Sequence, residues 1–108
     1  MSEFRNEKIK NMIKEHSALF IEKESGNTSL ITVTRVLISE DGKRATIMIS
    51  VLPKDKEKAA YGFIKRNLGE LRKEIMKNLK INPVPFLDVK IDEGEKNRQK
   101  IDELLING

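Results

Sequence analysis

The sequence has no cysteine and no tryptophan, one histidine, and no apolar stretch long enough to cross a membrane as a helix. Without cysteine the chain can form neither a disulfide nor a thiolate metal site. A zinc site is excluded as well, because a single histidine leaves too few suitable ligands. The first residues, Met1 to Phe4, lack the basic-then-apolar pattern of a secretion signal. We therefore expect a soluble, cytoplasmic protein.

Residues that could support catalysis are also scarce. The chain has no P-loop, no G-x-G-x-x-G sequence and no nucleophile elbow. His16 lies among the apolar residues of a predicted helix, which favours a place at the rim of the core over a catalytic role. Asp88 and Asp92 flank a predicted strand and could bind a divalent cation, although solvated carboxylates at a strand end explain them more simply. We expect no enzyme activity, no cofactor and no metal.

The length of 108 residues and the apolar patterning fit a single α+β domain, with its core between about residues 4 and 92. The predicted elements are a helix at 3–24, strands at 30–39 and 44–52, helix in two pieces from Lys54 to Lys80, a strand at 86–91, and a tail or short helix at 95–108. Asp41-Gly42 is typical of a hairpin turn. Asn67, Leu68 and Gly69 predict a kink or break. We expect the helices to pack on one face of a three-stranded sheet.

The net charge of +4 is concentrated in one segment of the chain. Between Lys54 and Lys80 there are seven lysines and two arginines against four acidic residues, an excess of five positive charges. In an ideal helix Lys73, Lys77 and Lys80 fall on one face, opposite the apolar residues. Such a row attracts a polyanion through phosphate neutralisation and counterion release. The simpler alternative is a solvated face that only keeps the protein soluble.

From this pattern we predict a surface that contacts RNA phosphates. Its candidate residues are Lys65, Arg66, Arg72, Lys73, Lys77 and Lys80, together with Lys43 and Arg44 from the hairpin turn. Arginine can form two parallel hydrogen bonds to a phosphate, whereas lysine acts as a point charge. The one tyrosine and four phenylalanines mostly occupy positions where the pattern places the core. We therefore expect the RNA backbone and shape to be recognised, without base stacking.

The predicted order of helices and strands is that of the type II KH domain, which has a G-x-x-G loop between its two central helices. Here the junction at 66–70 has one glycine, so the loop is absent. Three stretches, 33–41, 69–72 and 84–92, resemble the bacterial ribosome-binding factor A family. They are similar to its Ser-x-Asp before the hairpin turn, its Gly-x-x-Arg helix start and its Pro-x-Leu-x-Phe-x-x-Asp strand. The resemblance runs from about Phe4 to Leu105.

The resemblance implies a role in ribosome assembly. Members of that family bind the free small ribosomal subunit, assist late maturation of its rRNA without catalysis or a cofactor, and are associated with adaptation to cold. We accordingly expect a monomer whose partners are the small subunit and its rRNA, with no membrane and no small-molecule substrate. Asn67 and Asn82 depart from the family, which usually has Ala and often Arg there. The alternatives are a general KH-like module for single-stranded RNA, which the missing loop disfavours, and an interaction domain that binds no RNA.

Overall fold

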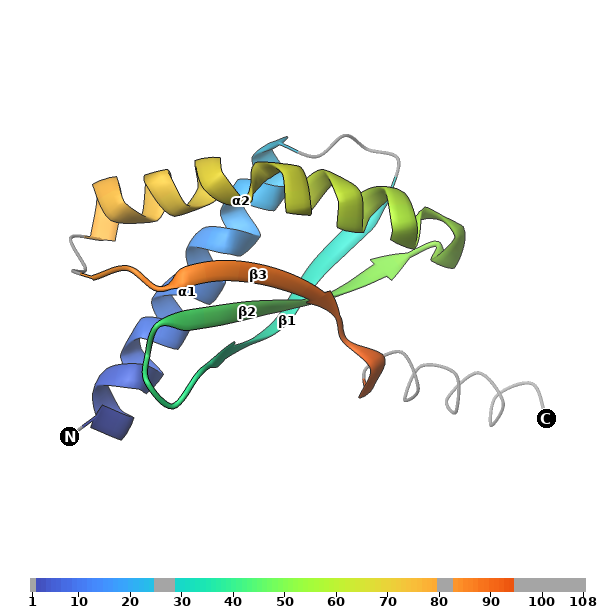
Figure 1. The fold of residues 1–108 in the computed structure, drawn as a ribbon. Coiled ribbons are helices and arrows are strands. Elements are labelled where there is room, and N and C mark those ends of the chain that lie inside the picture. The colour runs from blue at the N-terminus through green and yellow to red at the C-terminus, as the bar shows by residue number, and fades with distance from the viewer. Residues whose placement is uncertain (1, 25–28, 80–82, 95–108) are drawn as a thin grey trace.

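The computed structural model describes residues 2–24, 29–79 and 83–94, which form an α+β fold (Figure 1). Its elements are helix α1 (Ser2–Glu24), strands β1 (Leu30–Ile38) and β2 (Arg44–Leu52), a short 3-10 helix η1 (Lys54–Lys56), helix α2 (Glu57–Leu79) and strand β3 (Phe86–Ile91). The first helix and all three strands are confirmed to within one residue at each end. The predicted C-terminal helix at 95–108 lies outside the described residues.

Strand β2 is the centre of the three-stranded sheet, with β1 antiparallel on one side and β3 parallel on the other. Asp41-Gly42 forms the predicted hairpin turn, where Gly42 has a φ of 72° that favours glycine. Asp41 Oδ1 accepts hydrogen bonds from the Ser39 hydroxyl at 2.6 Å and the Lys43 N–H at 3.0 Å. The parallel return of β3 requires a crossover, and α2 provides it.

The core lies between the sheet and the two helices, which cover the same face (Figure 1). Strand β2 contributes alternate residues, as expected for a sheet with one buried face, namely Ala45, Ile47, Ile49 and Val51. In β1 the pairing register shifts between Val33 and Arg35. This bulge turns both Val33 and Val36 inward although they are three residues apart.

Helix α2 corrects one prediction, because the two expected helical pieces are a single uninterrupted helix. Its apolar stripe keeps helical phase through the expected break, with Ala60 and Ile64 buried before it and Leu71 and Ile75 after it. Asn67 does not break the helix, because its side-chain amide donates to the Phe63 carbonyl one turn earlier, at 2.8 Å. A bend of the helix axis at 67–69 stays a prediction.

Two side chains of α2 reach the edge strand β3 and the two residues just before it. Lys65 Nζ forms an ion pair with Asp88 Oδ1 at 2.9 Å. Arg72, seven residues later on the same side of the helix, donates from Nε to the Pro85 carbonyl at 3.2 Å and from Nη2 to the Val84 carbonyl at 2.8 Å. The hydrogen bond from Lys65 lowers the pKa of Asp88 below its usual 3.8. These links join the side of α2 that carries Lys65 and Arg72 to β3 and the residues just before it.

Shortening either Leu71 or Ile75 to alanine should lower the free energy of unfolding by about 2–5 kcal/mol, because each deletion leaves a cavity in a packed core. Leu71 is 1% exposed and Ile75 is 0% exposed. The matched change Lys77→Ala on the exposed side of α2 should alter the free energy of unfolding by less than about 0.5 kcal/mol. Urea unfolding of the three variants measures these differences. A loss for Lys77→Ala similar to the losses for the two core variants would mean that the buried and exposed sides of α2 are assigned wrongly.

Replacing Lys65 by methionine should destabilise the protein at neutral pH but not in strong acid. The pKa of Asp88 is lower in the folded chain, so the stability from the ion pair is complete above the usual value of 3.8 and is lost as the pH falls through the lower, folded value. The effect should be small, since the pair is largely exposed. Urea unfolding of the variant and the wild type, from neutral pH to strong acid, measures this loss of stability. The matched control is Lys58→Met, because Lys58 has no salt bridge to a described residue. A loss for Lys65→Met that persists unchanged in acid would contradict the assignment.

Candidate nucleic-acid interface

The solvent side of α2 presents three of the predicted cations, Arg66, Lys73 and Lys77, which we call the basic face of α2. Their spacing of seven and four residues places them in one row along the helix. Arg66 and Lys77 form no salt bridge with any residue that the structure describes. Lys73 Nζ lies 3.8 Å from Glu70 Oε1, a contact between two exposed side chains that contributes little. The row is therefore available to an external anion.

The remaining predicted cations do not join this row. Lys65 and Arg72 lie on the side of α2 next to β3, where one is paired with Asp88 and the other is bonded to two backbone carbonyls. Lys43 and Arg44 are exposed at the end of the β1–β2 hairpin. Lys80 lies outside the described residues. The structure thus divides the predicted set into an exposed row and a second group around the start of β3.

The second group forms because β3 starts beside the hairpin turn. The Phe86 N–H donates to the Lys43 carbonyl at 2.9 Å, and Phe86 is the register partner of Arg44 in the parallel pair of strands. Arg72 reaches the same point from α2, with its Cζ atom 4.6 Å from the centre of the Phe86 ring, which is a cation–π distance. One cation, Arg72, therefore lies against the Phe86 ring, and a second, Arg44, lies on the neighbouring strand at the same register position.

Phe86 is a residue that the sequence reasoning missed. We expected most aromatic side chains to lie in the core, yet Phe86 is 65% exposed. Leu87, Val89 and Ile91 pack toward the core, so strand alternation turns Phe86 the other way. This alternation was a signal in the sequence that could have separated Phe86 from the core aromatics.

The two carboxylates of this region are engaged by other groups: Asp88, within β3, by Lys65, and Asp92, just after β3, by residues of β1. Asp92 is 4% exposed, and its Oδ2 accepts a hydrogen bond from the Thr34 hydroxyl at 2.6 Å and lies 3.3 Å from Arg35 Nε. These contacts compensate the burial of the charge. Among the described residues no group of three or more His, Cys, Asp or Glu side chains is placed to hold a metal ion.

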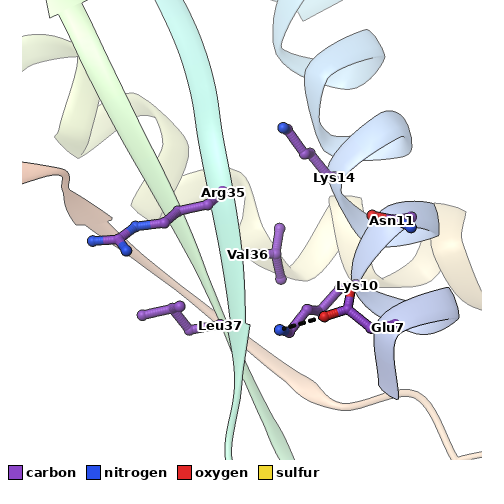
Figure 2. Close-up of a pocket in the computed structure, with 7 residues that line it drawn as sticks. All are labelled: Glu7, Lys10, Asn11, Lys14, Arg35, Val36 and Leu37. Atoms are coloured by element: carbon purple, nitrogen blue, oxygen red, sulfur yellow. Dashed lines mark hydrogen bonds and ion pairs between the residues drawn. The ribbon is translucent and has the colours of Figure 1, made fainter. Parts of the chain in front are cut away.

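A hollow of about 340 Å³ lies between α1 and β1 (Figure 2). It is lined by Glu7, Lys10, Asn11, Lys14, Arg35, Val36 and Leu37. Lys10 Nζ is paired with Glu7 Oε1 at 3.2 Å, which neutralises one charge. The Arg35 side chain extends away from α1 (Figure 2), toward its partner Asp92. Lys14 alone is left as a lining cation without a described salt bridge, so the hollow attracts anions less than the basic face of α2 does.

None of the described helices has the length and hydropathy that crossing a bilayer requires. The interface built above is thus composed of an exposed cation row on α2 and an exposed aromatic ring at the start of β3 that contacts Arg72. His16, the one histidine of the sequence, is half-buried on α1. The arrangement is suited to holding a polyanion in place.

Comparison with known proteins identifies the family. The family model described as Ribosome-binding factor A matches residues 5–105. The ribosome-binding factor A of Thermosipho africanus is 31% identical over 109 residues, which cover 95% of this chain and 86% of that protein. The crystal structure of ribosome-binding factor A from Thermus thermophilus has a TM-score of 0.67 at 19% identity, covering 77% of this chain and 91% of that chain.

A second similar structure is a homology model of the Thermus thermophilus protein fitted into a cryo-EM map of its complex with the 30S subunit. It has a TM-score of 0.65 at 20% identity and covers 75% of this chain and 88% of that chain. At such identities the two structures support the fold alone. The family model, in contrast, spans nearly the whole sequence. The chain therefore belongs to the ribosome-binding factor A family.

Proposed function

We propose that this chain is a ribosome-assembly factor that binds the free small ribosomal subunit through phosphates of its rRNA. In this proposal it assists late maturation of that rRNA without catalysing a reaction. The observation that carries the proposal is the basic face of α2, formed by Arg66, Lys73 and Lys77 on a helix whose opposite side is fixed in the core. Family membership supports it, and so does the related Thermus thermophilus protein, which was fitted in a complex with the 30S subunit.

The basic face has the dimensions of a phosphate-binding surface. From Arg66 to Lys77 an α-helix rises about 16 Å, so the row extends along several phosphates of an RNA strand. The helix backbone that carries the row is held in place, since Leu71 and Ile75 anchor the same helix turns in the core. Arg66 lies back along the helix, with its Nη1 only 3.3 Å from where a Cβ of Gly62 would stand. Glycine at that position leaves room for the guanidinium.

Binding of this kind can assist maturation without chemistry. A protein that binds one RNA conformer more tightly than another shifts the population toward it by that difference in affinity. Phosphate contacts are salt-sensitive, which suits a factor that must leave before the subunit is used. A monomer acting in the cytoplasm meets these requirements. A general KH-like module for single-stranded RNA is less well supported, because the junction at 66–70 has no G-x-x-G clamp.

The protein should sediment with free small subunits at low salt and be released at high salt. Three phosphate contacts predict that the logarithm of the binding constant falls against the logarithm of salt with a slope of about −2 to −3. Sedimentation at constant Mg²⁺ over a salt series measures this slope. Absence from the subunits at low salt would overturn the proposal, and equal affinity for an unrelated single-stranded RNA would favour the general KH-like module.

Reversing two charges of the basic face, with Lys73→Glu and Lys77→Glu together, should weaken small-subunit binding by roughly tenfold or more and make the salt slope shallower by about two. The matched control is Lys8→Glu with Lys23→Glu, two exposed lysines of α1 that change the net charge equally. Circular dichroism melting verifies that both double variants fold. Equal losses for the two pairs would mean that net charge, and not the basic face, drives binding.

A further inference from the structure

We propose that Phe86 and Arg72, with Arg44 beside them, form a site that binds one unpaired RNA base stacked on the Phe86 ring. We call these three residues the Phe86 site. The proposal rests on the proposed function, because it assumes that the ligand is RNA. It goes beyond phosphate binding by adding a contact to a base.

The first step of the argument is the position of the ring. Phe86 is the first residue of β3 at the edge of the sheet, and it is 65% exposed while Val89 on the same strand is fully buried. A single exposed apolar side chain indicates nothing by itself. The surroundings of this ring are what indicate a ligand.

The second step is that the ring is held by a fixed arginine. Two backbone carbonyls, those of Val84 and Pro85, accept hydrogen bonds from Arg72, so its guanidinium cannot move freely. The guanidinium lies against the ring, 4.6 Å from its centre, and Phe86 is still 65% exposed. A base that stacks there meets a surface whose conformation is already set, which reduces the entropy lost on binding.

The third step is charge, which selects a nucleotide as the occupant. Arg44 is the register partner of Phe86, so its side chain lies on the same face of the sheet at about 4.8 Å backbone spacing. The acid two residues along the strand, Asp88, is neutralised by Lys65. The site thus combines an aromatic surface for a base with cations for its phosphate.

The fourth step is continuity with the basic face of α2. Arg72 and Lys73 are consecutive, so one points to β3 while the next points to solvent. The basic face and the Phe86 site are thus linked by adjacent residues of one helix, and in this proposal one RNA contacts both. Bases inside a duplex are not available for stacking on a side chain. The expected substrate is an rRNA segment in which an unpaired nucleotide adjoins a structured phosphate backbone.

The test compares Phe86→Leu and Phe86→Trp in the full-length chain, with binding to purified free small subunits as the measurement. Phe86→Leu should weaken binding at least about fivefold, because the stacking surface is lost. The salt slope should not change, since no phosphate contact is removed. Phe86→Trp should bind at least as tightly as the wild type. The matched control is Leu19→Ala, which alters another exposed apolar side chain, 63% exposed, on α1.

A second measurement identifies what lies on the ring. Ultraviolet crosslinking of the wild-type complex, followed by nuclease and trypsin digestion, should leave a nucleotide attached to the tryptic peptide 81–90, which contains Phe86. The Phe86→Leu complex should lack this adduct. A crosslink from this peptide to a ribosomal protein would overturn the proposal in favour of a protein contact. Thermal unfolding verifies that the variants fold.

The outcomes separate this proposal from the proposed function. Wild-type binding with no loss for Phe86→Leu, or with a loss equal to that of Leu19→Ala, overturns the Phe86 site and leaves the assembly role intact. A wild-type chain that does not bind small subunits overturns both. A loss confined to Phe86→Leu with an unchanged salt slope supports the site, because charge reversal on the basic face changes that slope and loss of stacking does not.

Discussion

The contact between the apolar side of α2 and the sheet determines where every proposed RNA-binding group lies. Ile64, Leu71 and Ile75 are buried against the strands, and helix geometry then directs the residues on the opposite side outward. Arg66 and Lys77 are among those residues, so their exposure is a consequence of core packing. If α2 were rotated by one residue, about 100° around its axis, the cation row and the apolar stripe would no longer face opposite environments.

The cations of α2 have different tasks although they are close in the sequence. Lys65 and Arg72 are directed to β3, where Asp88 and two carbonyls bind them. Both side chains therefore stabilise the position of the helix, and neither is a freely exposed phosphate ligand. Lys73 differs because it follows Arg72 by one residue and so projects from another side of the helix. Net charge alone would have treated all of them as equivalent.

The two parts of the interface provide different physical contributions. Phosphate contacts from the basic face supply affinity and orientation but contain no information about sequence. A ring that accepts an unpaired base responds to whether the RNA at that point is folded into a duplex. A factor that has both contacts can distinguish conformers of one RNA, which is what a non-catalytic role in subunit maturation requires.

The sequence by itself determined the features that depend on local periodicity. The bounds of α1 and the strands, the hairpin turn at Gly42 and the exposure of Lys73 and Lys77 all follow from repeats or turn signals within a few residues. Only the tertiary structure decided the rest. It made α2 one helix where Gly69 suggested a break, because a continuous apolar stripe packs on the sheet.

Tertiary structure also brought Arg44, Arg72 and Phe86 together and placed Asp92 beside Thr34. These contacts join segments far apart in the sequence, through a parallel strand pairing and a crossover helix. The periodicity of a short stretch of sequence cannot predict such a pairing, because the register is fixed only when the two strands and the helix pack on one core. The basic row could therefore be predicted from the sequence, whereas the aromatic site beside it could not.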